Sequence, residues 1–282
     1  MPLKETLSRA IDRLTGARVG SPRMNAEVLL MFTLGVDRAH LYAYPERELT
    51  HEESARYEVA LSQRASGVPS QYITGHQEFW GMDLIVSPAV LIPRPETEHV
   101  IETVLALARK ITTPRIVDVG TGSGCLALAL AKELPHAEIH ATEISAAALE
   151  IARANAGRLQ LSGRVHFHET DLLQNLGSES FDFIVSNPPY VGESEEDTVQ
   201  LEVRKCEPRS AVFAGPTGLE VIARLVPQAH TTLKPGGWLF MEISGTIASG
   251  VRELLSEWDD LLVTNDLQGI PRVVSARKPA GK

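Results

Sequence analysis

The segment RIVDVGTGSGCLALALAKEL, residues 115–134, decides the fold of this chain. It begins with a short, mostly apolar run and continues into a loop in which Gly120, Gly122 and Gly124 alternate with Thr121 and Ser123. A stretch rich in alanine and leucine follows without a turn signal. Glycine lets a backbone turn sharply and approach a ligand closely. The order therefore predicts a buried strand, a ligand-binding turn and a helix.

The same alternation continues toward the C-terminus. Further apolar runs predict strands at 138–143, 165–170, 181–189 and 238–243, and helical patterns fill 146–159 and 219–233. Strands that alternate with helices and are apolar on both faces are typical of a doubly wound α/β sheet. The tail, LLVTNDLQGIPRVVSARK, predicts one more hairpin at the sheet edge.

The N-terminal part has a different texture, which predicts a small all-helical domain over residues 1–70. LKETLSRAIDRL places Leu3, Leu7, Ile11 and Leu14 on one helical face. Ser21 before a proline predicts an N-cap, and Thr50 three residues before a glutamate predicts a capping box. Residues 71–98 contain two short extended runs around a glycine, which predicts a β-hairpin linker, and residues 99–282 form the α/β domain.

Composition limits the function classes. Of 282 residues, 43% are hydrophobic and 22% charged, as in an ordinary globular protein, and no run is long enough to cross a membrane. The net charge of −9 argues against unspecific nucleic-acid binding. Two cysteines are too few for a disulfide framework and fit a reducing cytoplasm. We therefore expect a cytoplasmic protein without a membrane or nucleic-acid partner.

The glycine loop is followed by an acid at the distance typical of nucleoside-binding sites. Glu143 ends the next predicted strand, about 20 residues downstream, where an acid commonly binds ribose hydroxyls. A dinucleotide site would need G-x-G-x-x-G, but Cys125 stands where its last glycine would fall. The pattern predicts a nucleoside-bearing ligand, and the glycine spacing is the less phosphate-directed form of such a loop.

The stretch IVSNPPYV, residues 184–191, ends a predicted core strand with Asn187, Pro188, Pro189 and Tyr190. The asparagine side-chain oxygen can accept hydrogen bonds, and so can backbone carbonyls whose proline neighbours have no N–H to donate. Such acceptors favour an –NH₂ group, and the tyrosine ring can pack on a planar one. Because parallel strands present their carboxyl ends to one crevice, this site should face the glycine loop.

Histidines at 166 and 168 fall on the same side of a predicted strand, but no third ligand accompanies them. We therefore predict no metal site.

Taken together, GTGSG, the acid at 143 and NPPY resemble class I S-adenosylmethionine-dependent methyltransferases that alkylate planar nitrogens. The runs QYITGHQEFWG, VLIPRPETE and CEPRSAVFAGPTGLE resemble, more specifically, the protein glutamine methyltransferases that act on peptide chain release factors, and so does the helical N-terminal region. The resemblance spans nearly the whole chain. It implies an enzyme that uses S-adenosyl-L-methionine to methylate N5 of the glutamine in the Gly-Gly-Gln (GGQ) loop of bacterial class 1 release factors. We expect this enzyme to act as a monomer.

The resemblance also implies roles for individual residues. Residues 120–124 would surround the methionine part of the cofactor, and Glu143 would bind the ribose, where the family more often carries aspartate. Asp171 and Leu172 would contact the adenine, although the family sometimes has an aromatic residue at 172. Substrate contacts would come from the NPPY residues, with Asn187 also bordering the cofactor, and from the rim of the site. The implied substrate-binding and catalytic set is Asn187, Pro188, Pro189, Tyr190, Arg94 and Glu96.

Three alternatives stay open at the level of sequence. NPPY also occurs in DNA adenine N6-methyltransferases, where it would hold a flipped base, but the chain is acidic and shows no basic DNA-reading domain. A sister family of methyltransferases, which has the same core, methylates a glutamine of a ribosomal protein. A non-catalytic nucleoside-binding protein or a dinucleotide-dependent protein is opposed by the early Gly124 and the intact NPPY.

Overall fold

The computed structural model describes residues 1–280 and divides them into two compact units. The first comprises Met1–His76 together with Gln200–Cys206, and the second comprises Gln77–Val199 together with the described residues from Glu207 onward. Residues 200–206 thus belong by their contacts to the helical unit, although their sequence lies inside the predicted α/β domain. No local sequence pattern predicts that residues 200–206 pack with the helical unit.

The first unit is all-helical. Its core contains Leu3, Leu14, Leu29, Leu30 and Leu61, all at most 5% exposed. The helices are α1 (Leu3–Gly16), α2 (Pro22–Leu34), α3 (Arg38–Ala43), α4 (His51–Ala65), α5 (Ser70–Thr74) and α9 (Leu201–Cys206). The amphipathic spacing predicted for the first helix is confirmed, since Leu3 and Leu14 are buried and the other two predicted residues, Leu7 and Ile11, pack against the same core.

Buried polar groups connect α9 to the rest of this unit. The guanidinium of Arg64, which is 4% exposed, donates to Asn25 Oδ1 at 2.7 Å and to Glu202 Oε1 at 2.5 Å. The thiol of Cys206 lies 3.6 Å from the carbonyl oxygen of Gly67. A buried guanidinium is stable only when it is paired. Arg64 therefore explains why residues 200–206 pack with the helices.

The two predicted helix starts have different outcomes. The capping box of α4 is confirmed, because Thr50 Oγ1 accepts from the Glu53 amide and the Glu53 carboxylate accepts from the Thr50 amide. Pro22 opens α2 and Ser21 occupies the N-cap position, as predicted, but the Ser21 side chain does not cap the helix. Ser21 has a φ of +48°, whereas a capping side chain needs extended backbone, and its hydroxyl makes no cap hydrogen bond.

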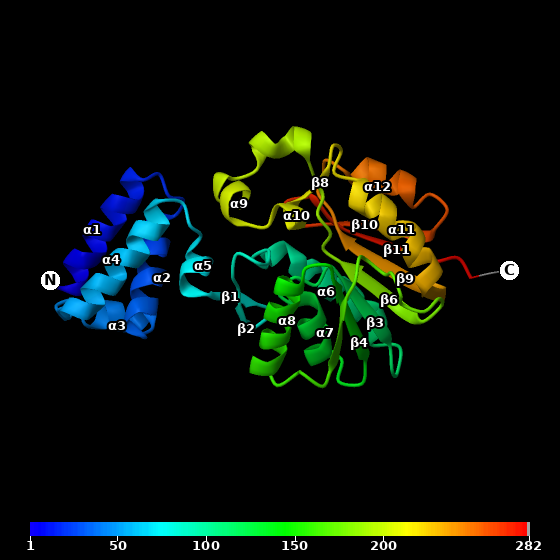
Figure 1. The fold of residues 1–282 in the computed structure, drawn as a ribbon, viewed down its shortest axis with the longest axis horizontal. Helices are drawn as coiled ribbons and strands as arrows, with labels where there is room; N and C mark the ends of the chain where they lie inside the picture. The colour runs from blue at the N-terminus through cyan, green and yellow to red at the C-terminus, as the bar shows by residue number, and fades with distance from the viewer. Residues whose placement is uncertain (281–282) are drawn as a thin grey trace. The chain divides into compact units, whose positions relative to one another are not determined.

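The second unit is built on a seven-stranded sheet of order β10-β11-β9-β6-β3-β4-β5 (Figure 1). Neighbours from β9 to β5 run parallel, and β11 and β10 add an antiparallel edge, which confirms the predicted terminal hairpin. The strands are β3 (Arg115–Val119), β4 (Glu138–Glu143), β5 (Val165–Glu169), β6 (Phe181–Ser186), β9 (Leu233–Glu242), β10 (Asp259–Asn265) and β11 (Pro271–Arg277).

Alternate residues of the central strands pack into two cores, one on each face of the sheet. Ile116 and Phe183 face α6 (Glu98–Ala108), α7 (Cys125–Glu133) and α8 (Ala146–Arg158). Val117 and Ile184 face α11 (Glu220–Thr232) and α12 (Ala248–Leu254) (Figure 1). Burial on both faces is the reason these strands are continuously apolar. The predicted doubly wound α/β sheet is confirmed.

The predicted hairpin is formed by β1 (His76–Phe79) and β2 (Met82–Ile85). Phe79, Met82 and Leu84 are buried in the core beside α6 to α8, so the hairpin packs against the α/β unit. The side chain of Asn155 on α8 connects it to the glycine loop. Asn155 Oδ1 accepts from Ile85 N at 2.7 Å, while Nδ2 donates to the carbonyls of Ile85 and Ser123 at 3.0 and 2.9 Å.

We expect Asn155→Leu to destabilise the α/β unit by about 3 kcal/mol, because three backbone groups would lose the partner that the buried Asn155 side chain provides, while leucine keeps the branched shape. Urea denaturation followed by tryptophan fluorescence measures this unit alone, since Trp80, Trp238 and Trp258 all lie in it. Glu150→Leu on the exposed side of α8 is the matched control and should shift stability little. Equal stability of the two variants would contradict the assigned role.

Candidate functional site

The site lies where the strand order reverses. β3 and β6 are neighbours in the sheet, but the helices that follow β3 cover one face while α11 and α12 cover the other. Loops from their carboxyl ends therefore separate and leave a crevice, the usual ligand position in open α/β sheets. A cavity of about 370 Å³ lies there, and its lining includes residues that follow β3, β4, β5 and β6.

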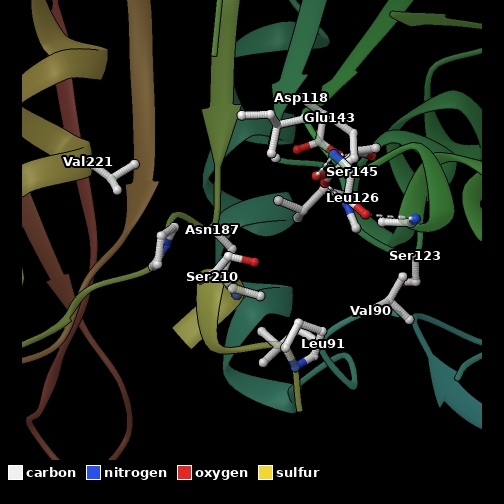
Figure 2. Close-up of a pocket in the computed structure, with 18 of the residues that line it drawn as sticks. Val90, Leu91, Asp118, Ser123, Leu126, Glu143, Ser145, Asn187, Ser210 and Val221 are labelled. Carbon is white, nitrogen blue, oxygen red and sulfur yellow. Dashed lines mark hydrogen bonds between the residues drawn. The ribbon is translucent and has the colours of Figure 1, made fainter. Parts of the chain in front are cut away.

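The structure brings most of the predicted site residues together in this cavity. Figure 2 shows Asp118, Glu143 and Ser145 grouped on one wall, with Asn187 and Ser210 at another. Of the predicted residues, the cavity lining contains Gly120, Thr121, Gly122, Ser123, Glu143, Asp171, Leu172, Asn187 and Pro189. Gly124, Pro188, Tyr190, Arg94 and Glu96 lie outside that lining.

The glycine loop has the conformation that its sequence requires. Gly120, Gly122 and Gly124 all have positive φ, at +71°, +55° and +85°. A Cβ at Gly120 or Gly122 would meet no described atom within 4 Å, whereas one at Gly124 would lie 3.0 Å from Leu128 Cδ1. The first two glycines therefore leave open space along the cavity, and the third allows the loop to pack on α7.

Glu143 holds the glycine loop against the next strand. Its Oε2 accepts from Gly122 N and its Oε1 from Ser145 N, both at 3.0 Å. The amides of Gly120 and Thr121 donate to the carbonyl of Thr142 at 2.9 and 3.0 Å. A carboxylate has about four acceptor positions, so Glu143 can still accept bonds from ligand hydroxyls at the cavity wall.

Asp118, on β3, is a cavity acid that the sequence interpretation missed. It is 1% exposed, and its Oδ2 accepts from Thr121 Oγ1 at 2.6 Å and from Ala127 N at 3.2 Å. Its Oδ1 has no hydrogen-bond partner among the described residues. Burial raises the pKa of this carboxyl to about 7. A buried acceptor without a partner, beside a cavity, is suited to a cationic ligand group.

Asn187 is oriented by a neighbour from a distant segment. Its Nδ2 donates to Thr97 Oγ1 at 3.1 Å, and Thr97 also lines the cavity. Tyr190 donates through its hydroxyl to the buried carboxylate of Glu242 at 3.1 Å. Burial, followed by the charge of Glu242, raises the pKa of the Tyr190 phenol, so the hydroxyl stays a donor. Neither Thr97 nor Glu242 was predicted from the sequence.

The predicted rim residues are engaged with other side chains. Arg94 pairs with Glu207 at 2.5 Å, and the same buried carboxylate accepts from Ile92 N at 3.2 Å. Glu96 lies 3.9 Å from Arg272. Arg94 thus connects the segment before the 3-10 helix η1 (Pro95–Thr97) to the segment that begins at Glu207.

Residues 207–220 form a wall that the sequence interpretation did not place. They contain α10 (Arg209–Val212) and β8 (Phe213–Gly215), and β8 pairs in parallel with β7 (Val191–Gly192), directly after NPPY. Pro208, Ser210, Ala211 and Phe213 line the cavity. A Cβ on Gly218 would lie 2.5 Å from the carbonyl oxygen of Tyr190, so only glycine permits this close approach.

Asp171 and Leu172 follow β5 at the far end of the cavity. Asp171 forms an ion pair with Arg224 of α11, and both line the cavity. Leu172 has a φ of +52°, an unusual conformation for leucine, and packs against the core beside α11. This end of the cavity is therefore bounded by one apolar side chain and one ion pair.

The histidines lie elsewhere. The two predicted residues, His166 and His168, both contact the ring of His140 on β4. His140 Nδ1 lies 2.9 Å from His168 Nε2, and the centroids of these two stacked rings are 5.1 Å apart. Within residues 1–280, no group of three or more histidine, cysteine or acidic side chains is placed to hold a metal ion. In the same range, no helix is both long and apolar enough to cross a membrane.

Comparison with known proteins agrees with this geometry. A family model described as PrmC N-terminal domain matches residues 5–75, and one described as Methyltransferase small domain matches residues 99–205. The release factor glutamine methyltransferase of Koribacter versatilis is 54% identical over 280 residues, covering 99% of each chain. The one from Moorella thermoacetica is 42% identical, covering 90% of this chain and 89% of its own.

A solved structure, the T. thermophilus 16S rRNA methyltransferase in complex with AdoMet and guanosine, shares the fold. It has a TM-score of 0.53 at 20% identity and covers 72% of this chain and 49% of its own. The sheet therefore has the class I methyltransferase fold, and the near full-length identity to curated relatives is decisive: this chain belongs to the release factor glutamine methyltransferase family.

Proposed function

We propose that this protein methylates the side-chain amide nitrogen (N5) of the glutamine in the GGQ motif of bacterial class 1 release factors. The observation that carries the proposal is the orientation of Asn187 at the cavity. Because its Nδ2 is bonded to Thr97, its Oδ1 is left to accept a hydrogen bond from a substrate –NH₂ group. Membership of the family supports the choice of a release factor.

The cofactor is S-adenosyl-L-methionine, and the cavity residues fit it. The unpartnered Oδ1 of Asp118 suits the methionine ammonium, and the open space at Gly120 and Gly122 suits its chain. Glu143 would bind the ribose hydroxyls, with Asp171 and Leu172 beside the adenine. When bound, this cofactor supplies an electrophilic methyl group on a sulfonium centre.

The protein's own task is to orient a poor nucleophile. An amide nitrogen has its lone pair delocalised into the carbonyl, as in the peptide bond. We propose that Asn187 Oδ1 and the Pro188 carbonyl accept the two N–H groups, while Pro189 and Tyr190 pack on the amide plane. The acceptors stabilise positive charge that develops on nitrogen, and correct placement can contribute about 7–11 kcal/mol in favourable cases. No dedicated general base is needed, because the proton can leave afterwards.

Other features of the proposal concern the partner. We propose that the helical unit contributes to recognition of the release factor, that Arg94 and Glu96 support the rim, and that the enzyme acts as a monomer without nucleic acid. A cytoplasmic location would follow from a substrate that acts in translation.

Methyl transfer from labelled S-adenosylmethionine to three acceptors tests the proposal. The acceptors are an unmodified bacterial release factor, the same factor with its GGQ glutamine changed to alanine, and unmethylated duplex DNA. We expect label on the first alone. Label on DNA would replace the substrate assignment by adenine methylation, and label on both factors would place the methyl group outside the motif.

We expect Glu143→Gln to weaken cofactor binding by about tenfold, because one carboxylate oxygen becomes an amide –NH₂ group while the side-chain size is kept. That group can accept neither from a ribose hydroxyl nor from the Gly122 or Ser145 amide. Turnover at saturating cofactor should change little. Glu169→Gln is the matched control, because Glu169 is aligned with Glu143 on the neighbouring strand but is exposed and outside the cavity lining. Calorimetric titration measures both, and equal affinities would remove Glu143 from the ribose role.

A further inference from the structure

A buried carboxylate stands behind the substrate side of the cavity without lining it. Glu242 ends β9, is 1% exposed, and lies outside the cavity lining. Ionising a carboxyl there is costly unless donors surround it. Its Oε2 accepts from Thr97 Oγ1 at 2.6 Å and its Oε1 accepts from Tyr190 OH at 3.1 Å. Each oxygen therefore has one hydroxyl donor, and both donors come from segments that border the cavity.

The charges around this group act in opposite directions. Burial raises the pKa of the Glu242 carboxyl and nearby Glu96 adds to this, whereas the Thr97 and Tyr190 hydroxyls and the charge of Arg272 lower it. Arg272 is itself held by Asp266 at 2.9 Å. A core position that served only for packing would be filled by an apolar residue at lower cost. The presence of a buried carboxyl group at this position needs another explanation.

The explanation is the direction of the hydrogen bonds. Thr97 and Tyr190 both donate to oxygens of Glu242, so Thr97 uses its one hydroxyl proton toward that carboxyl group. The oxygen of Thr97 is then available only as an acceptor toward Asn187, and the amide group that can satisfy it is Nδ2. Asn187 Oδ1 is consequently turned away from Thr97. One carboxylate thus fixes which end of the asparagine amide the substrate meets.

We propose that Glu242 and Thr97 are positioning residues that select the acceptor-outward orientation of Asn187, and that Glu242 also holds the Tyr190 ring in place. This inference rests on the proposed glutamine methylation. A reversed Asn187 would present Nδ2 to the substrate –NH₂ group, so two donors would face each other. The same reversal would favour a side chain that only accepts, such as a carboxylate. The chain of bonds therefore sets both turnover and the preference for glutamine over glutamate.

Substitutions at Thr97 separate the hydroxyl from the side-chain volume. We expect Thr97→Val, which keeps the shape, to lower kcat on a release factor at least about tenfold, and Thr97→Ser to lose no more than about threefold. Thr103→Val is the matched control on α6, since the Thr103 hydroxyl donates only to the carbonyl of His99. Cofactor affinity measured by calorimetry should agree within about threefold among all four proteins.

A second measurement reads the orientation itself. A release factor with its GGQ glutamine changed to glutamate is tested as a competitive inhibitor, against the same factor with alanine at that position. The wild-type enzyme should bind the glutamate factor less tightly than the alanine factor, and Thr97→Val should reduce or reverse this difference. Glu242→Gln should act in the same direction, because its amide –NH₂ must face one of the two hydroxyls.

Each outcome has a distinct meaning. A wild-type enzyme that labels no release factor defeats the proposed function before the variants are compared. If the wild type is active and Thr97→Val matches Thr97→Ser in both kcat and inhibitor preference, the positioning role is wrong. Loss of cofactor affinity in Thr97→Val equal to its loss of kcat would also overturn it, because Thr97 would then act on the cofactor.

Discussion

Replacing Asn187 with alanine is expected to lower kcat for release factor methylation by about a thousandfold, while the cofactor dissociation constant changes no more than about threefold. The side chain borders the cavity, and its Nδ2 is already committed to Thr97. The group that is lost is therefore the Oδ1 acceptor for the substrate amide. That acceptor becomes more important as positive charge develops on the nitrogen, so the loss falls mainly on the transition state.

Asn187→Asp provides the matched comparison. Aspartate retains an acceptor oxygen at the cavity, but its second oxygen replaces the Nδ2 donor to Thr97. The hydrogen bond to Thr97 is then lost unless the Thr97 hydroxyl donates to the aspartate instead of to Glu242. We expect a smaller loss of kcat than for alanine, with cofactor binding again preserved. Single-turnover labelling and calorimetric titration give the two quantities. Parallel loss of turnover and cofactor affinity in Asn187→Ala would show that the residue serves the cofactor instead.

The second large effect is expected at Asp118. We expect Asp118→Asn to weaken S-adenosylmethionine binding by at least about thirtyfold, or about 2 kcal/mol, because an amide –NH₂ would replace a charged acceptor facing the ammonium. The Oδ2 bonds from Thr121 and Ala127 can be kept by the asparagine carbonyl, so the fold should persist. Glu143→Gln, measured in parallel, separates this ammonium contact from the ribose contact.

The ionisation of Asp118 should also make the affinity for S-adenosylmethionine depend on pH. Burial raises the pKa of Asp118 from 3.8 to about 7, so the carboxyl is largely protonated in the free protein below that pH. A cation binds the ionised form, and affinity should therefore rise as pH increases from about 5 to 7 in the wild type. Asp118→Asn should show a flat profile over the same range. A wild-type profile that is equally flat would show that Asp118 is not the ammonium partner.

As pH rises, the free energy of unfolding should fall while the cofactor affinity increases. Because the folded pKa of Asp118 lies above the unfolded value of 3.8, ionising this carboxyl costs folding free energy as pH rises from about 4 to about 7. Asp118→Asn removes that cost and should be at least as stable as the wild type at neutral pH. The acid is thus kept at the expense of stability, as expected for a ligand-binding group.

Much of the site could be predicted because it follows from local pattern. The glycines at 120, 122 and 124 require positive φ, and the strand before them is buried on both faces. Since parallel strands end at one edge, Asn187 was expected to meet this loop, and the structure places both at one cavity. Asp118 was also visible as the only charged residue within IVDV, an acid in a core strand. That signal was overlooked.

The remaining features depend on contacts between distant segments, which no local pattern encodes. Thr97 and Glu242 are 145 positions apart, and Arg94 and Glu207 are 113 apart. The run VLIPRPETE contains Arg94, but nothing in this run indicates which carboxylate pairs with the arginine. The membership of residues 200–206 in the helical unit depends in the same way on Arg64 finding Glu202. Such pairs become visible only in three dimensions.

Tandem mass spectrometry of an unmodified release factor, after incubation with this enzyme and S-adenosylmethionine, locates the transferred methyl group directly. We expect one added methyl group, located on the side-chain amide of the glutamine in the GGQ motif. We also expect this peptide to stay unmodified with Asn187→Ala. The proposed glutamine methylation would be wrong if the methyl group were found on another residue. It would also be wrong if the factor stayed unmodified in the presence of enzyme that binds its cofactor.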